Sequence, residues 1–468
     1  MPALSELKAR ATAAVTASRG EILALSHAIH ADPEPAFEEH RAAARVAEAI
    51  AAHGYAVEHP AGRLATAVRG RLSGGLGPDG PRIGVLAEYD ALPGLGHGCG
   101  HNTMAASGVG AAIALAAVRD AFAGEVVFLG TPAEERGSGK QFMLDDGLFD
   151  GLDAALLFHP ADRDMVNCVL LASEDVDVAF SGKAAHAASE PWEGRNALDA
   201  VVLLLQAIGL WRQQLPQHAR VHGIVLEGGT AANIIPDRAT ARFMIRSTDQ
   251  VYFESMRERF RALVSGAAMM AAVTGEVTFS GGSTTMKDNR TLAGLWRANM
   301  EALGRVDEGV DPEHIGSSDM GNVSRAVPTI HPSLAICDHG VAWHSIESLR
   351  AAATPRADET TLLAASLVAR IALDLLLDPA LVDTAWKEFR GAPGAEEPRV
   401  TEVNDPADAV RLAGPGARRP CPARQGTPSP RRSPMRSRAS TTWTCWTIPG
   451  ISTSGSPLPR RPAARFWS

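Results

Sequence analysis

The amino-acid sequence predicts an α/β protein that carries a smaller α+β domain as an insertion, and the order of its apolar stretches is the reason. Three short apolar runs, at 82–88, 125–131 and 154–158, have the length and composition of buried strands in a mostly parallel sheet. The stretch 103–122 is rich in alanine and glycine and is typical of a helix packed closely on a sheet. Strand, helix and strand in this order predict an α/β domain.

A different order follows the third apolar run and predicts the inserted domain. An alternating strand at 174–182 precedes a helix, two more alternating strands, a second helix and a last strand at 276–281. This is the ferredoxin-like order of strands and helices. We therefore expect a larger domain made of 1–174 and 287–392, with the ferredoxin-like domain 175–286 inserted between its two parts.

Length and composition are those of a soluble globular protein, with 468 residues, 45% of them hydrophobic and 21% charged. The sequence contains no uncharged apolar run of about 18 residues, so no membrane helix is expected. The segment 1–23 carries charges throughout and lacks the apolar centre of a secretory signal. Five widely spaced cysteines do not resemble a disulfide framework. These features predict a cytoplasmic protein with no membrane partner.

The C-terminal segment 393–468 differs in composition from the rest of the chain. Its last part, 413–468, contains ten arginines, no acidic residue and many prolines and serines. We expect a disordered basic tail, because such a segment buries too little apolar surface to offset its ordering entropy. Its abrupt onset suggests a readthrough or frame-shifted end. The rest of the chain is more acidic than the overall charge of −8, which argues against nucleic acid as a partner.

Polar residues that can bind a metal follow each of the three apolar strands. Since sites in open α/β sheets gather outside the carboxyl ends of the strands, we expect these residues to meet. In chain order they are Asp90, Cys99, His101, Glu134, Glu135 and His159.

The glycine-rich loop 94–104, "GLGHGCGHNTM", allows several interpretations. A phosphate-binding loop needs the spacing G-x-G-x-x-G, and its third glycine position is occupied here by Cys99 or His101. A metal site and a cysteine nucleophile remain, besides a buried cysteine with a hydrogen-bonded histidine. Adjacent carboxylates at Glu134 and Glu135 favour the metal site, because they repel each other unless a cation lies between them or one of them is protonated.

A further ligand is expected from "DHGVAWHSIES", which contains His339 and His344. The resulting donors suit zinc or a similar divalent ion. Five protein ligands are too many for one tetrahedral ion and suit two ions that share a bridging ligand. The set is Cys99, His101, Glu135, His159 and His344.

The motifs "LAEYDALPGLGHGCGHN", "GTPAEERGSGK", "GGTAANIIPD", "SSDMGNVS" and "WHS" resemble the dinuclear-metal aminoacylase and glutamate carboxypeptidase family. The branch they resemble is that of amidohydrolases such as aminobenzoyl-glutamate hydrolases and Xaa-Arg-type dipeptidases. The resemblance covers about residues 25–375. It implies a zinc-peptidase-like α/β catalytic domain with two divalent metal ions, zinc first and manganese or cobalt next. It also implies that the inserted domain serves as a lid and as the contact of a homodimer.

The resemblance assigns roles to residues near the metals. Cys99 would bridge the two ions in place of the aspartate of the wider family, which leaves the preferred metal open. Glu134 would be the general base and acid. Asp90 would orient a ligand, although a turn-capping aspartate explains that residue equally well.

In the inserted domain, His186 would reach across a dimer and stabilise the oxyanion in the partner's site, although the sequence alone favours an ordinary loop histidine. Asn233 would hold the carboxylate or carbonyl of the substrate. Arg246 would bind a substrate carboxylate or form a structural salt bridge. Ser318, with its neighbours Ser317 and Asp319, would shape the substrate pocket.

The expected function is metal-dependent hydrolysis of the amide bond of small N-acyl amino acids or dipeptides, and an aminobenzoyl-glutamate substrate also fits. One alternative is a thiol hydrolase with Cys99 as nucleophile and His101 or His97 as base. The other is a non-catalytic metal-binding protein on the same fold.

Overall fold

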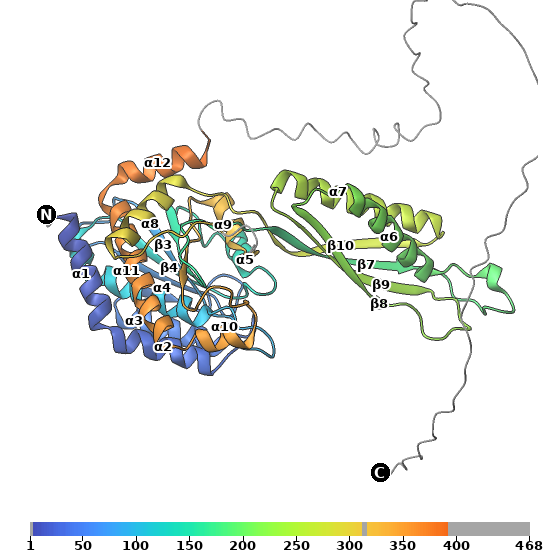
Figure 1. The fold of residues 1–468 in the computed structure, drawn as a ribbon, viewed down its shortest axis with the longest axis horizontal. Helices are drawn as coiled ribbons and strands as arrows, with labels where there is room; N and C mark the ends of the chain where they lie inside the picture. The colour runs from blue at the N-terminus through green and yellow to red at the C-terminus, as the bar shows by residue number, and fades with distance from the viewer. Residues whose placement is uncertain (1–2, 311–315, 392–468) are drawn as a thin grey trace, which may run out of the picture. The chain divides into compact units, whose positions relative to one another are not determined.

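The computed structural model describes residues 3–310 and 316–391 (Figure 1), so the expected tail at 393–468 lies outside the described residues. The larger domain is built on a five-stranded sheet with the order β1-β2-β4-β3-β5. Its three parallel strands are those predicted from sequence: β3 (Arg82–Glu88), β4 (Glu125–Thr131) and the edge strand β5 (Ala154–Leu156).

Two strands that the sequence analysis did not identify extend this sheet beyond β4. They are β1 (Ala56–Glu58) and β2 (Val68–Ser73), and both pair in antiparallel fashion. The sheet is therefore parallel at its centre and antiparallel at one edge. Charged residues interrupt β2 at alternate positions, which hides it from a search for continuous apolar runs.

Helices of small residues cover the sheet. In α4 (His101–Ala116) Gly108 approaches the sheet so closely that an added Cβ would lie 2.8 Å from the Cβ of Ala87. α4 packs in turn against α11 (Pro355–Leu377). α11 is the helix in the described part of the chain that is long and apolar enough to cross a membrane, but 78% of that window is buried inside the protein. Its apolar character is therefore that of a core helix.

The remaining elements of the larger domain surround this core. β6 (His159–Ala161) and β11 (Ser333–Ala335) form a short parallel pair. The helices are α1 (Leu4–Ala17), α2 (Arg19–Ala31), α3 (His40–Ala52), α5 (Gly139–Asp145), α8 (Arg290–Ala302), α9 (Met320–Ala326), α10 (Ile346–Ala351) and α12 (Pro379–Phe389).

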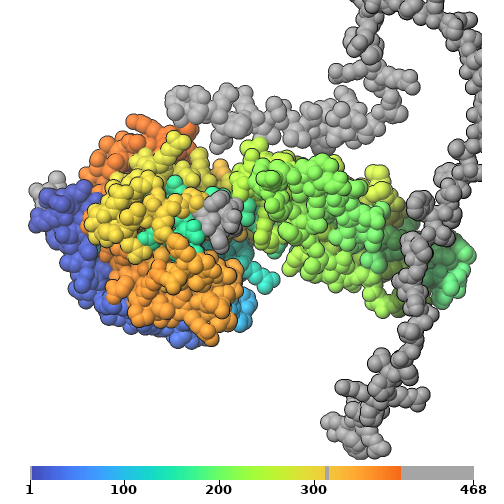
Figure 2. All heavy atoms as spheres, viewed as in Figure 1, coloured from blue at the N-terminus to red at the C-terminus, as the bar shows by residue number. Residues whose placement is uncertain are grey.

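The inserted domain has its own antiparallel sheet, with the order β10-β7-β9-β8, and its own hydrophobic core. Alternate side chains of β7 point into this core, where α6 and α7 cover one face of the sheet (Figure 1). Strand order and helix positions are ferredoxin-like, as predicted. Its elements are β7 (Ala172–Ser181), α6 (Ala197–Trp211), β8 (Ala219–Glu227), β9 (Arg238–Ser247), α7 (Gln250–Met270) and β10 (Thr274–Ser283), drawn from green to yellow-green in Figure 2.

Candidate metal centre

The loop 94–104 turns Cys99 and His101 toward one point because glycine separates them. Gly100 has a φ of 76°, and an added Cβ would lie 2.7 Å from Cγ of Pro160. Left-handed backbone and lack of space both require glycine there. α4 begins directly after it, so Cys99 lies in the loop and His101 in the first helical turn.

The structure brings all five predicted ligands together in two groups of three. In each group the donor atoms lie within 4.8 Å of one another. Cys99 belongs to both groups, which is the position of a bridging ligand. The groups are Cys99, His101 and His159, and Cys99, Glu135 and His344.

Two of the histidines are held with Nε2 turned toward the site. Nδ1 of His101 lies 3.0 Å from the carbonyl oxygen of Asp90, and Nδ1 of His159 lies 2.7 Å from that of Pro160. Because a carbonyl oxygen only accepts hydrogen bonds, both Nδ1 atoms carry a proton, and Nε2 is the atom that each neutral ring would offer to a metal. Nε2 of His101 is buried and has no hydrogen-bond partner within the described residues. Both rings are thus oriented as metal ligands usually are.

Asp90 connects the two donor groups. One carboxylate oxygen lies 3.0 Å from Nδ1 of His101, and the other accepts a hydrogen bond of 2.9 Å from the backbone N–H of Glu135. The side chain is fully buried. Asp90 therefore touches a predicted ligand of each group, and this geometry supports the orienting role rather than a turn cap.

Strained backbone presents the two adjacent glutamates. Ala133, directly before Glu134, has a φ of 59°, and its N–H donates a 2.8 Å hydrogen bond to Oε1 of Glu39. Such left-handed non-glycine residues cost free energy and cluster at functional sites. The sequence analysis missed Glu39, which is buried and lies far from the strand ends along the chain.

The loop before α10 brings His344 to Cys99. The backbone N–H of His344 and the hydroxyl of Ser348 both donate to the carbonyl of Gly98, at 3.3 and 2.7 Å. His344 itself has a φ of 60°, and its Nε2 lies 3.5 Å from Oε2 of Glu135. His339, the alternative ligand, is more than half exposed and pairs with Glu308 at 2.9 Å instead.

The buried carboxylates around the donor atoms favour the binding of cations. Burial, with Glu88 and Glu135 nearby, raises the pKa of Glu134 well above its ordinary value. Burial also raises the pKa of Glu135 to about 7. Divalent ions at the two donor groups would compensate this excess of buried carboxylates, so the residues present fit two metal ions. The carboxylates are those of Glu88, Asp90, Glu134, Glu135 and Asp319.

The same environment disfavours a thiol hydrolase. Burial raises the pKa of the Cys99 thiol, and the charge of Glu135 raises it further. A cysteine nucleophile needs a lowered pKa instead, whereas a bound metal deprotonates a thiol outright. His97, one expected base, is buried, stacks on His30 at 6.2 Å and belongs to neither donor group.

A buried lysine beneath the donors was not predicted. Nζ of Lys140 lies 2.7 Å from Oε1 of Glu88 and 2.6 Å from Oδ1 of Asp319. All three side chains are fully buried or nearly so. Glu88 is a charged residue at the end of a largely apolar strand. A charged side chain at such a position predicts that a polar partner lies nearby.

The structure does not bring the other predicted residues into the donor groups. His186 and Asn233 are exposed residues of the inserted domain. The backbone N–H of Ala187, next to His186, donates a 3.0 Å hydrogen bond to the carbonyl oxygen of Asn233. Nε of Arg246 lies 3.0 Å from the sulfur of Met244. The hydroxyl of Ser318 accepts a hydrogen bond from the first residue of α9. Their roles toward substrate stay predictions.

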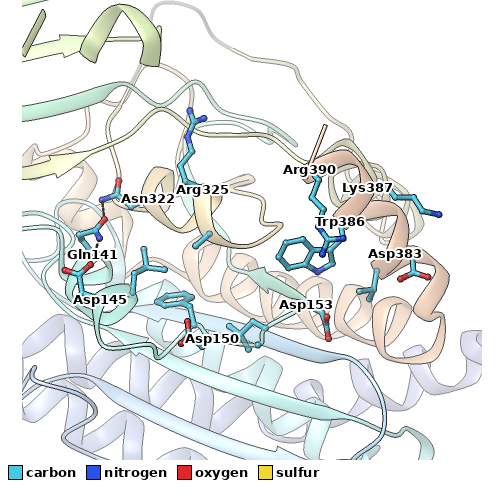
Figure 3. A pocket seen from close by; sticks show the side chains of 16 residues that line it. Gln141, Asp145, Asp150, Asp153, Asn322, Arg325, Asp383, Trp386, Lys387 and Arg390 are labelled. Atoms are coloured by element: carbon cyan, nitrogen blue, oxygen red, sulfur yellow. Dashed lines mark hydrogen bonds between the residues drawn. The ribbon is translucent and has the colours of Figure 1, made fainter. Parts of the chain in front are cut away.

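A hollow of about 760 Å³ between α5, α9 and α12 is a separate feature (Figure 3). Asp145, Asp150 and Asp153 line one part of it, and Trp386 and Arg390 line another. None of the five predicted metal ligands is among its lining residues.

An α/β domain with two donor groups around one shared thiol, and with a further glutamate beside them, has the residues that a two-metal hydrolase needs. The family model of peptidase family M20/M25/M40 matches residues 84–364. The chain belongs to this family of hydrolases, as the motifs predicted.

Relatives and solved structures agree with this assignment. The chain is 36% identical over 402 residues to the Xaa-Arg dipeptidase of Mus musculus, and the matched region covers 83% of this chain and 93% of the relative. It is 35% identical over 300 residues to one of the subunits of the p-aminobenzoyl-glutamate hydrolase of Escherichia coli, covering 60% of this chain and 62% of the relative.

Two solved structures share the fold. One is a dinuclear metal binding peptidase of the M20 family from Bacillus subtilis, with a TM-score of 0.60 and 20% identity, covering 77% of this chain and 99% of that one. The other is an aminobenzoyl-glutamate utilization protein from Klebsiella pneumoniae, with a TM-score of 0.61 and 22% identity, covering 77% of this chain and 97% of that one.

Proposed function

We propose that this protein uses two metal ions to hydrolyse the amide bond of dipeptides or small N-acyl amino acids that carry a free carboxylate. The observation that carries the proposal is the pair of donor groups sharing Cys99, with Glu134 beside them: its Oε2 lies 3.9 Å from Nε2 of His101. The names of the relatives support the substrate class, and an aminobenzoyl-glutamate fits it too. A thiol, imidazoles and one carboxylate favour zinc, with manganese or cobalt next.

The chemistry follows from the residues around the ions. Metal ions held by the two donor groups would polarise the scissile carbonyl and lower the pKa of the attacking water molecule. Glu134 takes a proton from that water as its oxygen bonds to the carbonyl carbon. Glu134 then delivers the proton to the nitrogen as the C–N bond breaks, which yields an amine and a carboxylic acid that ionises in water. Asp90 holds His101 and Glu135 in place throughout.

His186 is suited to stabilise the oxyanion. Its Nδ1 accepts hydrogen bonds from the backbone N–H groups of Ala188 and Ser189, at 3.2 and 3.1 Å. Nδ1 is therefore unprotonated and Nε2 carries the proton, ready to donate to a negative oxygen. We assign this donor to the site of a partner subunit, with Asn233 binding the substrate carbonyl or carboxylate beside it.

We also propose that the protein is a homodimer through the inserted domain. β8 is an edge strand, so among the described residues one side of its backbone has no strand partner. Large apolar side chains are exposed on this strand and on the preceding helix α6, and together they favour self-association. They are Val202, Leu205, Leu210, Ile224, Val225 and Leu226.

The described cysteines, which are all free, support a cytoplasmic location.

A hydrolysis screen of the metal-reconstituted enzyme tests the function. The panel contains N-acyl amino acids, dipeptides and aminobenzoyl-glutamate, and mass spectrometry detects the products. We expect turnover of at least one class and its complete loss after chelation. Bound metal without any turnover would instead support a non-catalytic metal-binding protein, and activity that survives chelation would support a thiol hydrolase.

A further inference from the structure

Lys140 is a fully buried lysine fixed by three contacts beneath the candidate metal centre. Its ammonium bridges Glu88 and Asp319 at 2.7 and 2.6 Å, and its own backbone N–H donates to Oδ2 of Asp319 at 2.9 Å. A charge buried to this depth is stable only when it is paired, so each carboxylate depends on the lysine for compensation. The ammonium is therefore held in one place by α5, β3 and the start of α9.

The second oxygen of Glu88 faces the metal centre. Oε2 lies 3.2 Å from Nε2 of His101, and neither atom has a hydrogen-bond partner within the described residues. Ligand atoms in a tetrahedral zinc shell, with bonds of about 2 Å, lie roughly 3.3 Å apart. Glu88 thus stands at the distance of a neighbouring ligand from His101.

Glu88 is nevertheless not placed with Cys99. It forms a group with His101 and Glu134, but among the described residues it belongs to neither group that contains Cys99. The carboxylate is close enough to enter the coordination shell after a small side-chain movement, and its pairing with Lys140 opposes that movement.

We propose that Lys140 is a positioning residue that withholds Glu88 from the metal ion bound by Cys99, His101 and His159. Three protein ligands leave one position of that ion open for water or substrate, as catalytic zinc sites require. A carboxylate from Glu88 would fill the position and convert the site into a closed, structural one. This inference rests on the proposed function.

The test is the visible spectrum of the cobalt(II)-substituted protein. Lys140→Met is expected to change the spectrum, because Glu88 then becomes a ligand, and to lower kcat/KM by about 10- to 100-fold. Adding Glu88→Gln to this variant is expected to restore the wild-type spectrum. Glu88→Gln alone is expected to leave the spectrum unchanged, since Glu88 is not a ligand while Lys140 is present.

Lys8→Met is the matched control. Lys8 on α1 forms a largely buried ion pair with Asp374 of α11 at 2.5 Å, so its loss lowers stability without touching the metal centre. Its cobalt spectrum should equal that of the wild type. If Lys140→Met does not fold, Lys140→Gln replaces it, because its amide keeps a hydrogen bond but lacks the charge.

Two results would overturn the inference. One is a wild-type cobalt spectrum in the folded Lys140 variant. The other is an altered spectrum that persists when Glu88→Gln is added. Failure of the wild-type protein to bind cobalt would instead refute the two-metal function itself, so the two failures are distinguishable.

Discussion

Sγ of Cys99 lies 3.5 Å from Nε2 of His159, although 60 residues separate them in the chain. Cys99 lies in the loop after β3, and His159 begins β6, which directly follows β5, the neighbour of β3 in the five-stranded sheet. Nδ1 of His159 is bound to a carbonyl, which leaves Nε2 free to share a cation with the thiolate.

Glu134→Gln should abolish turnover and leave the metal content unchanged. The amide keeps the size of the carboxylate but cannot shuttle a proton, so we expect kcat to fall by about 100- to 10,000-fold. Steady-state kinetics and elemental analysis measure the two quantities. Glu301→Gln, an exposed glutamate of α8, is the control. Near-full activity of Glu134→Gln would refute the mechanism.

Replacing Cys99 should affect both metal ions at once, because its sulfur belongs to both donor groups. We expect Cys99→Ala to lose metal from both positions, whereas Cys99→Asp, which restores a bridging carboxylate, should retain metal and some activity. Metal titration of the two variants checks this. Full activity of metal-free Cys99→Ala would contradict the assignment.

Asp90→Asn should weaken metal binding by about 10- to 100-fold, the usual cost of removing the group that orients a ligand. The amide cannot accept from His101 and from the N–H of Glu135 as the two carboxylate oxygens do. Competition with a chelator gives the dissociation constants. An unchanged affinity would indicate that Asp90 is a turn-capping residue.

Glu39→Gln should change how the stability of the metal-free protein depends on pH. Burial, followed by the charge of Asp90, raises the pKa of Glu39 from 4.5 to about 7. Between these values the folded protein holds more protons than the unfolded chain, so stability falls as pH rises through this window.

The fall in the free energy of unfolding that is due to Glu39 is roughly 3 kcal/mol, and the glutamine variant should lack it. Denaturant unfolding of both proteins at pH 4.5 and pH 7 measures the difference. Glu38→Gln, the exposed neighbour, should behave as the wild type. Identical slopes for wild type and Glu39→Gln would show that Glu39 is not the group responsible.

His186→Ala and Glu134→Gln should complement each other when mixed. Each variant alone is expected to be inactive, but a mixed dimer contains one site with both intact residues. Random exchange of subunits should restore about a quarter of the wild-type activity. Light scattering establishes the dimer independently. No recovery in a mixture shown to exchange subunits would mean that His186 does not act across the interface.

Much of the fold was predictable because its signals are local. The continuous apolar runs of β3 and β4 identify buried parallel strands, and the polar residues after them mark the edge where donors gather. β1 and β2 escaped prediction, because short strands in an antiparallel edge have no continuous apolar run. The order of elements in the inserted domain also followed from periodicity.

The sequence by itself determined which donors exist and which strand each one follows. Only the tertiary structure decided that Asp90 contacts a predicted ligand of each donor group and that Glu39 and Lys140 support the site. These choices depend on contacts between segments distant in the chain, whose geometry is fixed by packing of the sheet and its helices. A local sequence pattern carries no information about distances between segments that lie far apart in the chain.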